Sequence, residues 1–101
     1  MDFELNLSQG AEQHLDEILQ CLKELNPELE PTSRDLAIAS AVISIGASLV
    51  VISSEIIKLV VKLRQKHPKG VIVLKSEDDR VIELLTASDD ELREFFKLMN
   101  E

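Results

Sequence analysis

The stretch from Leu36 to Leu63 limits what this chain can fold into more than any other part. Its first 19 residues, 36–54, carry no charge, and the first acidic residue after them is Glu55. Apolar residues recur at steps of three and four, which is the spacing that places side chains on one side of a helix. We therefore predict one long amphipathic helix over residues 33–66.

Two apolar lines run along this predicted helix. The first is a heptad-type seam that we expect to face the domain's own core, and it comprises Ile38, Val42, Ile45, Leu49, Ile52, Ile56, Leu59 and Leu63. The second contains small residues and predicts a self-association surface comprising Leu36, Ala39, Ile43, Gly46, Val50, Ile57 and Val61. A helix of about 31 residues would span ~46 Å, whereas a domain of this size has a radius of gyration near ~13 Å. We therefore expect a homo-oligomer assembled through the long helix.

Residues 36–54 also permit an alternative interpretation as a membrane-inserting helix, because 19 uncharged residues satisfy the length requirement for a span. Two observations favour a helix in water. A weakly polar stripe follows the whole helix, comprising Ser33, Ala37, Ser40, Ser44, Ser48, Glu55, Lys58 and Lys62. A span would also cut the chain into two pieces too small to be stable alone.

The segments around the long helix predict a small sheet and two further helices. They are a strand at 2–7, a helix at 11–26, a hairpin at 71–85 and a helix at 89–99. The strands show alternating or β-branched patterns, and the polar linker SEDD joins the two hairpin strands through a four-residue loop. Asn26-Pro27 ends the first helix, and Ser88 to Glu91 form a capping box for the last. The prediction is one α+β domain, 1–101, in the order β-α-α-β-β-α with about three strands.

The net charge of −8 argues against a nucleic-acid partner, because binding phosphate requires a basic surface. The basic residues do cluster, at Lys58, Lys62, Arg64, Lys66, His67 and Lys69. Cations suit the C-terminal end of a helix, and we favour that interpretation over an anion-binding or membrane-surface site. The acidic start MDFELNLSQG has no secretory-signal pattern, so we expect a cytoplasmic protein, with the membrane as the alternative.

No set of residues predicts catalysis, a cofactor or a metal site. His14 and Cys21 lie seven residues apart on the first helix, but a structural zinc site requires four ligands. His67, Asp78 and Asp79 are the other polar candidates, and they are scattered or explained by turns. The lone cysteine excludes an internal disulfide and is compatible with a reducing compartment.

The element order and the segment LAIASAVISIGASLVVISSEIIKLVVKLRQKHPKGVIVLKSEDDRVIELLTASDDELREFF resemble the bacterial effector-associated constant component family. The NPELEPT connector is shorter than in that family, and the SEDDR turn lacks the glycine that is common there. The resemblance implies a small non-enzymatic partner of effector and NTP-dependent regulatory proteins in bacterial conflict systems. It supplies no catalytic residue. We therefore expect an adaptor and assembly module.

Overall fold

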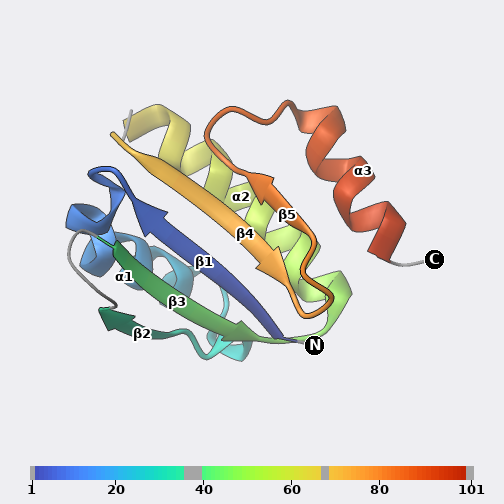
Figure 1. Cartoon of the computed structure of the whole chain (residues 1–101). Coiled ribbons are helices and arrows are strands. Elements are labelled where there is room, and N and C mark those ends of the chain that lie inside the picture. Colours follow the sequence, from blue (N-terminus) through green and yellow to red (C-terminus); the bar gives the residue numbers. More distant parts are fainter. Residues whose placement is uncertain (1, 36–39, 67–68, 100–101) are drawn as a thin grey trace.

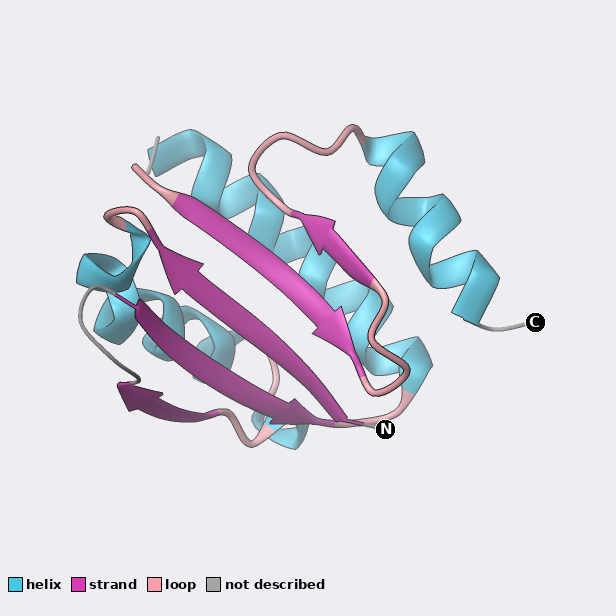
Figure 2. Ribbon diagram, viewed as in Figure 1, coloured by secondary structure: helices cyan, strands magenta, loops and turns pink. Residues whose placement is uncertain are grey.

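The computed structural model describes residues 2–35, 40–66 and 69–99 and shows a two-layer α+β domain (Figure 1). Five strands form one antiparallel sheet, and helices pack against it (Figure 2). In chain order the elements are β1 (Asp2–Ser8), the 3-10 helix η1 (Ala11–His14), α1 (Leu15–Leu25), the 3-10 helix η2 (Pro27–Leu29), β2 (Thr32–Asp35), β3 (Ser40–Gly46), α2 (Leu49–Lys66), β4 (Val71–Ser76), β5 (Val81–Glu83) and α3 (Asp89–Met99).

The strand order is β2-β3-β1-β4-β5, so the first strand of the chain lies at the centre of the sheet. The elements from β1 to β4 follow a β-α-β-β-α-β order, in which β3 lies between the parallel strands β1 and β2. This is the split βαβ arrangement of ferredoxin-like domains. The hairpin strand β5 and the helix α3 extend it at the β4 edge. Such a fold supports many functions and identifies none of them.

One face of the sheet carries the core. Phe3, Leu5 and Leu7 of β1 alternate with polar residues, as a strand with one buried face requires, and all three are fully buried. In register with them lie Ile45 and Ile43 of β3 and Leu74 of β4, among other core residues. In Figure 1 the core face is the back of the sheet, where α1 and α2 lie, and α3 lies beside β5. In the part of the chain that the structure describes, no helix covers the front face.

The prediction of one helix over residues 33–66 is wrong. Residues 32–35 and 40–46 form two paired strands, and α2 begins at Leu49. The side chain of Ser48 caps it by accepting a hydrogen bond from the backbone N–H of Val51, at 3.3 Å. The 18 residues of α2 span ~27 Å, which fits within the 36 Å length of the molecule, so no end protrudes.

The other predicted elements are present, with different bounds in places. The helix predicted at 11–26 is divided into η1 and α1, and the predicted hairpin 71–85 contains β4 and a shorter β5. The strand at 2–7 and the helix at 89–99 are confirmed. The α+β class is therefore right, whereas the order β-α-α-β-β-α and the count of three strands are wrong, because the sheet has two additional strands.

The interpretation of residues 36–54 as an apolar helix is also wrong, because residues 40–46 are a strand paired with β1. Across the described ranges, no helix combines the length and the apolar character that crossing a membrane needs.

Candidate functional site: the groove between α2 and α3

Helix α2 is buried along one side and borders a different helix on each flank. Ile52, Ile56, Leu59 and Leu63 recur at helical spacing and are nearly inaccessible to solvent. On one flank lies α1, which contributes Ile18 and Glu17 to a hollow beside α2. On the other flank lies α3, and the surface between α2 and α3 is a groove. The candidate site is this second flank.

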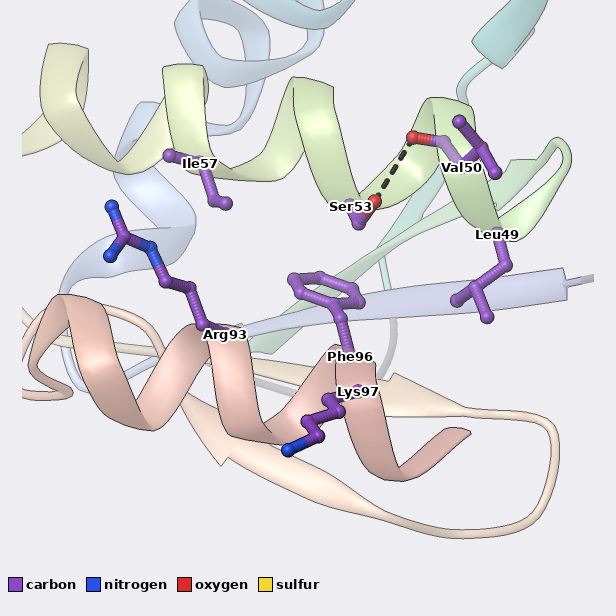
Figure 3. A pocket seen from close by; sticks show the side chains of 7 residues that line it. All are labelled: Leu49, Val50, Ser53, Ile57, Arg93, Phe96 and Lys97. Carbon is purple, nitrogen blue, oxygen red and sulfur yellow. Dashed lines mark hydrogen bonds between the residues drawn. The ribbon is translucent and has the colours of Figure 1, made fainter. Parts of the chain in front are cut away.

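The α2–α3 groove has a volume of ≈ 360 Å³ and is mostly apolar (Figure 3). Its lining residues are Leu49, Val50, Ser53 and Ile57 from α2 and Arg93, Phe96 and Lys97 from α3. The hydroxyl of Ser53 donates a hydrogen bond to the carbonyl oxygen of Val50, at 3.0 Å. Because that hydroxyl is satisfied within its own helix, the α2 wall presents mainly aliphatic surface to the groove.

Phe96 forms the floor of the groove. Its ring rises from α3 toward α2 in Figure 3, and the residue is largely buried. The ring centroid lies 6.5 Å from that of Phe3 on the central strand and 5.3 Å from that of Phe95, which meets it edge-on. Aromatic pairs at these separations stabilise a core beyond the area that they bury. The floor therefore contacts the central strand of the sheet, and these ring contacts help to dock α3 on the core.

Near the C-terminus of α2, outside the residues that line the groove, Arg64 joins α2 to the start of α3. Its guanidinium donates a hydrogen bond to the backbone carbonyl of Ala87 and lies 3.4 Å from a carboxylate oxygen of Asp89. The start of α3 is fixed further by the predicted capping box. The N–H of Glu91 donates to the Ser88 hydroxyl at 3.1 Å, and the N–H of Ser88 donates to the Glu91 carboxylate at 3.3 Å. The groove therefore has two walls of defined geometry.

Arg93 and Lys97 line the groove without an acidic partner among the residues that the structure describes. Some other cations are paired within the described structure, such as Lys66 with Glu17 and Arg80 with Asp78, whereas the exposed Lys23, Lys62 and Lys69 are not. Arg93 and Lys97 are one helical turn apart on α3, so their side chains are neighbours. They place two positive charges beside the apolar groove, on a helix that also carries the acidic residues Asp89, Asp90, Glu91 and Glu94.

Two residues of the predicted self-association surface, Val50 and Ile57, line this groove, and a third, Val61, lies one helical turn beyond Ile57. Val50, Ile57 and Val61 are separated by seven and four residues, which places them on one side of α2. We refer to them as the α2 stripe. Val50 is 77% exposed, Val61 is 50% exposed, and Ile57 is partly buried against the groove. Among the described residues four large aliphatic side chains are exposed, and Val50 and Val61 of the stripe are two of them.

The remaining residues of that predicted surface do not belong to it. Ile43 is fully buried in β3 opposite Leu5, so it cannot contact a second chain. Gly46 ends the same strand, and Leu36 and Ala39 lie outside the described residues. The prediction fails here because it rested on a helix where the chain forms a strand.

The predicted core seam is confirmed for those of its residues that lie in α2. Its α2 members Ile52, Ile56, Leu59 and Leu63 are buried, and Leu49 is partly buried at the groove. Val42 and Ile45 are buried as well, but in β3, where residues three apart point to opposite faces of the sheet. They therefore do not form one continuous seam with the helix. Ile38 lies outside the described residues.

The α1–α2 hollow on the opposite flank has a volume of ≈ 370 Å³ and is lined by His14, Glu17, Ile18, Leu63 and Lys66. The Lys66 ammonium lies 2.7 Å from one carboxylate oxygen of Glu17, and His14 Nδ1 lies 3.6 Å from the other. The hydrogen bond from Lys66 lowers the pKa of Glu17, and the same bond raises the pKa of Lys66. The polar side chains of this hollow therefore satisfy one another.

The cluster of basic residues has a structural explanation at several positions. Lys58 pairs with Glu55, Arg64 with Asp89 and Lys66 with Glu17, so these cations serve the fold. This supports the helix-end interpretation over an anion site, and His67 lies outside the described residues.

The carboxylate of Glu55 is not fully hydrogen-bonded. Its side chain is largely buried, one oxygen lies 3.4 Å from Lys58, and the other has no hydrogen-bond partner in the described structure.

The polar candidates from the sequence are spread over the molecule. Asp78 and Asp79 lie in the β4–β5 turn, where they pair with Arg80 and with Lys75. Cys21 is buried in α1, and His14 ends η1. In the ranges 2–35, 40–66 and 69–99, no group of three or more His, Cys, Asp or Glu side chains could hold a metal ion.

The chain matches no family model, no curated protein and no solved structure in the comparisons with known proteins. The interpretation of the groove therefore depends on its own chemistry. The sequence places Phe96 on the apolar face of the last helix, but it did not predict Arg93, Phe96 and Lys97 as residues of a site. The available signal was a pair of cations four residues apart beside the apolar face of the last helix.

Proposed function

We propose that this chain is a non-enzymatic adaptor and assembly module that binds other protein chains, including copies of itself, through the α2 stripe and the adjoining groove. The observation that carries the proposal is the exposure of Val50 and Val61 beside an apolar groove. Exposed aliphatic residues next to a concave apolar surface are typical of protein-interaction sites.

The resemblance to the effector-associated constant component family suggests which proteins are assembled. On that basis, the partner is an effector or an NTP-dependent regulatory protein of a bacterial conflict system. A rigid floor, a fixed α3 and an exposed stripe suit such a role, because a binding surface on packed helices loses little conformational freedom when it docks.

Light scattering of the purified chain tests the self-association part of this proposal. We expect the wild type to have a mass above that of one chain at micromolar concentration, and the double variant Val50→Asp/Val61→Asp to have the mass of a monomer. A charged residue within an apolar contact is costly because it loses its water without gaining a partner. A monomeric wild type would contradict self-association.

Val81→Asp/Leu98→Asp is the matched control. Val81 is 59% exposed and Leu98 is 46% exposed, and neither lines the groove or belongs to the α2 stripe. This control should retain the wild-type mass. If it dissociates as readily as Val50→Asp/Val61→Asp, the contact is not specific to α2.

A further inference from the structure

We infer that the α2–α3 groove binds an acidic amphipathic helix of a partner protein, with its apolar side on Phe96 and Ile57 and its carboxylates beside Arg93 and Lys97. This inference rests on the proposed function, since it assumes that the surface binds protein. It adds the chemistry of the segment that the surface takes.

Charge complementarity supports an acidic occupant. Arg93 and Lys97 lack acidic partners in the described part of the chain, whereas Arg64, which joins α2 to α3 outside the groove lining, is held by Asp89 and Ala87. The groove lining therefore has two cations that are available to a ligand. Complementary charges at the rim of an apolar contact select the partner and speed its approach.

The shape of the groove supports a helix. Two packed helices form its walls, and a volume of ≈ 360 Å³ has room for inserted side chains but not for a whole helix. An amphipathic helix lying along such a groove inserts its apolar side chains and leaves its polar side outside. Arg93 and Lys97, one turn apart on α3, match carboxylates spaced one turn apart on a helix that runs alongside.

The exposure of the site favours a protein segment over a lipid. Val50 is 77% exposed, so the groove is open along α2. A site for a small apolar ligand usually encloses most of that ligand's surface. The net charge of −8 repels any acidic partner at long range, and it repels an anionic membrane more, because a membrane faces many more of the chain's acidic residues than a single helix in the groove does.

Two synthetic fluorescent peptides test the inference in an anisotropy titration with the full chain. The first is a helix of roughly four turns with leucines along one side and glutamates flanking them, and the second has lysines in place of the glutamates. We expect the glutamate peptide to bind and the lysine peptide to bind at least about tenfold more weakly. Binding of the glutamate peptide should also weaken as salt is added.

Charge reversal provides the decisive comparison. Arg93→Glu/Lys97→Glu should weaken binding of the glutamate peptide by about tenfold or more and strengthen binding of the lysine peptide. The control Lys23→Glu/Lys62→Glu changes the net charge equally at exposed positions outside the groove, and it should change affinity much less. Equal effects of the two double variants would overturn the inference.

Further outcomes separate this inference from the proposed function. Equal binding of both peptides would overturn the acidic-helix occupant and leave the assembly function intact. So would a second result, in which neither peptide binds while the wild type forms multimers that Val50→Asp/Val61→Asp dissociates. In that second result the groove holds a second copy of the chain. Binding to phosphatidylglycerol vesicles without binding to the glutamate peptide would overturn it in favour of a lipid surface. A monomeric wild type that binds neither peptide would contradict both.

Discussion

The two flanks of α2 carry hollows of almost the same size, ≈ 370 Å³ beside α1 and ≈ 360 Å³ beside α3, but their charges are arranged differently. In the α1–α2 hollow, Lys66, Glu17 and His14 lie within reach of one another. In the α2–α3 groove, Arg93 and Lys97 line the α3 wall without acidic partners among the described residues. The comparison teaches that volume alone does not distinguish the two hollows. What distinguishes them is whether the charged side chains that line each hollow are paired with one another.

The largest expected effect tests whether both hollows have a floor that belongs to the core. Phe96→Ala should lower the free energy of unfolding by about 3–5 kcal/mol, and Ile18→Ala by about 2–5 kcal/mol, because each removes a well-packed side chain. Urea unfolding followed by circular dichroism measures both values. A loss below about 1 kcal/mol for Phe96→Ala would show that α3 is not docked as described.

The next effect concerns Glu55, which shares its side of α2 with Lys66 because the two are eleven residues apart. One of its carboxylate oxygens is buried without a hydrogen-bond partner. Glu55→Met should stabilise the fold by about 1 kcal/mol, since an unsatisfied buried acceptor is removed and the shape is kept. Thermal unfolding would detect this as a higher melting temperature. The exposed Glu94→Met is the control and should not give the same gain.

A smaller effect is expected at the rim of the groove. Arg93→Ala and Lys97→Ala should change the free energy of unfolding by no more than about 0.5 kcal/mol, because neither side chain forms an ion pair in the described structure. The same variants should weaken binding of the acidic peptide. A clear loss of stability in either variant, measured by urea unfolding, would show that the fold uses these cations and would remove the contrast with the α1 flank.

The smallest effect is the pH dependence of the α1 flank. The pKa of Glu17 is lowered from 4.5 by Lys66, so the pair contributes stability above pH 4.5 that is lost as the pH falls through the lowered value. Glu17→Gln should therefore show a shallower loss of melting temperature than the wild type below pH 4.5. Both partners are about half exposed, which keeps the effect small. Glu94→Gln is the control, and a wild-type profile in Glu17→Gln would contradict the pairing.

Strands β1 and β4, together with helices α1 and α3, could be predicted from local patterns, whereas strands β2 and β3, at 32–35 and 40–46, could not. Ser40, Ser44 and Ser48 are four residues apart, and that spacing keeps side chains on one face of a helix and also on one face of a strand. The pattern was therefore compatible with both structures. The signals that distinguish them were Gly46 as a breaker and Ser48 as an N-cap, together with the β-branched run before them.

The candidate site was predictable only in part for a related reason. Val50, Ile57 and Val61 lie in the real helix, so helical spacing correctly placed them on one side. Arg93 and Lys97 acquire their role only when α3 packs beside α2, more than thirty residues earlier in the chain. No local pattern encodes such a contact, because it depends on where the sheet positions both helices.

The central position of β1 has a consequence for how the chain folds. Phe3 pairs with Ile45 and with Ser76, which follow it by 42 and 73 residues. Strand β1 therefore cannot complete its pairing until the chain has been synthesised as far as Ser76. Contacts between residues so far apart slow folding, because a long loop must close before they form. We expect β1 to remain incompletely paired during synthesis, and the domain to become stable only in a late, cooperative step.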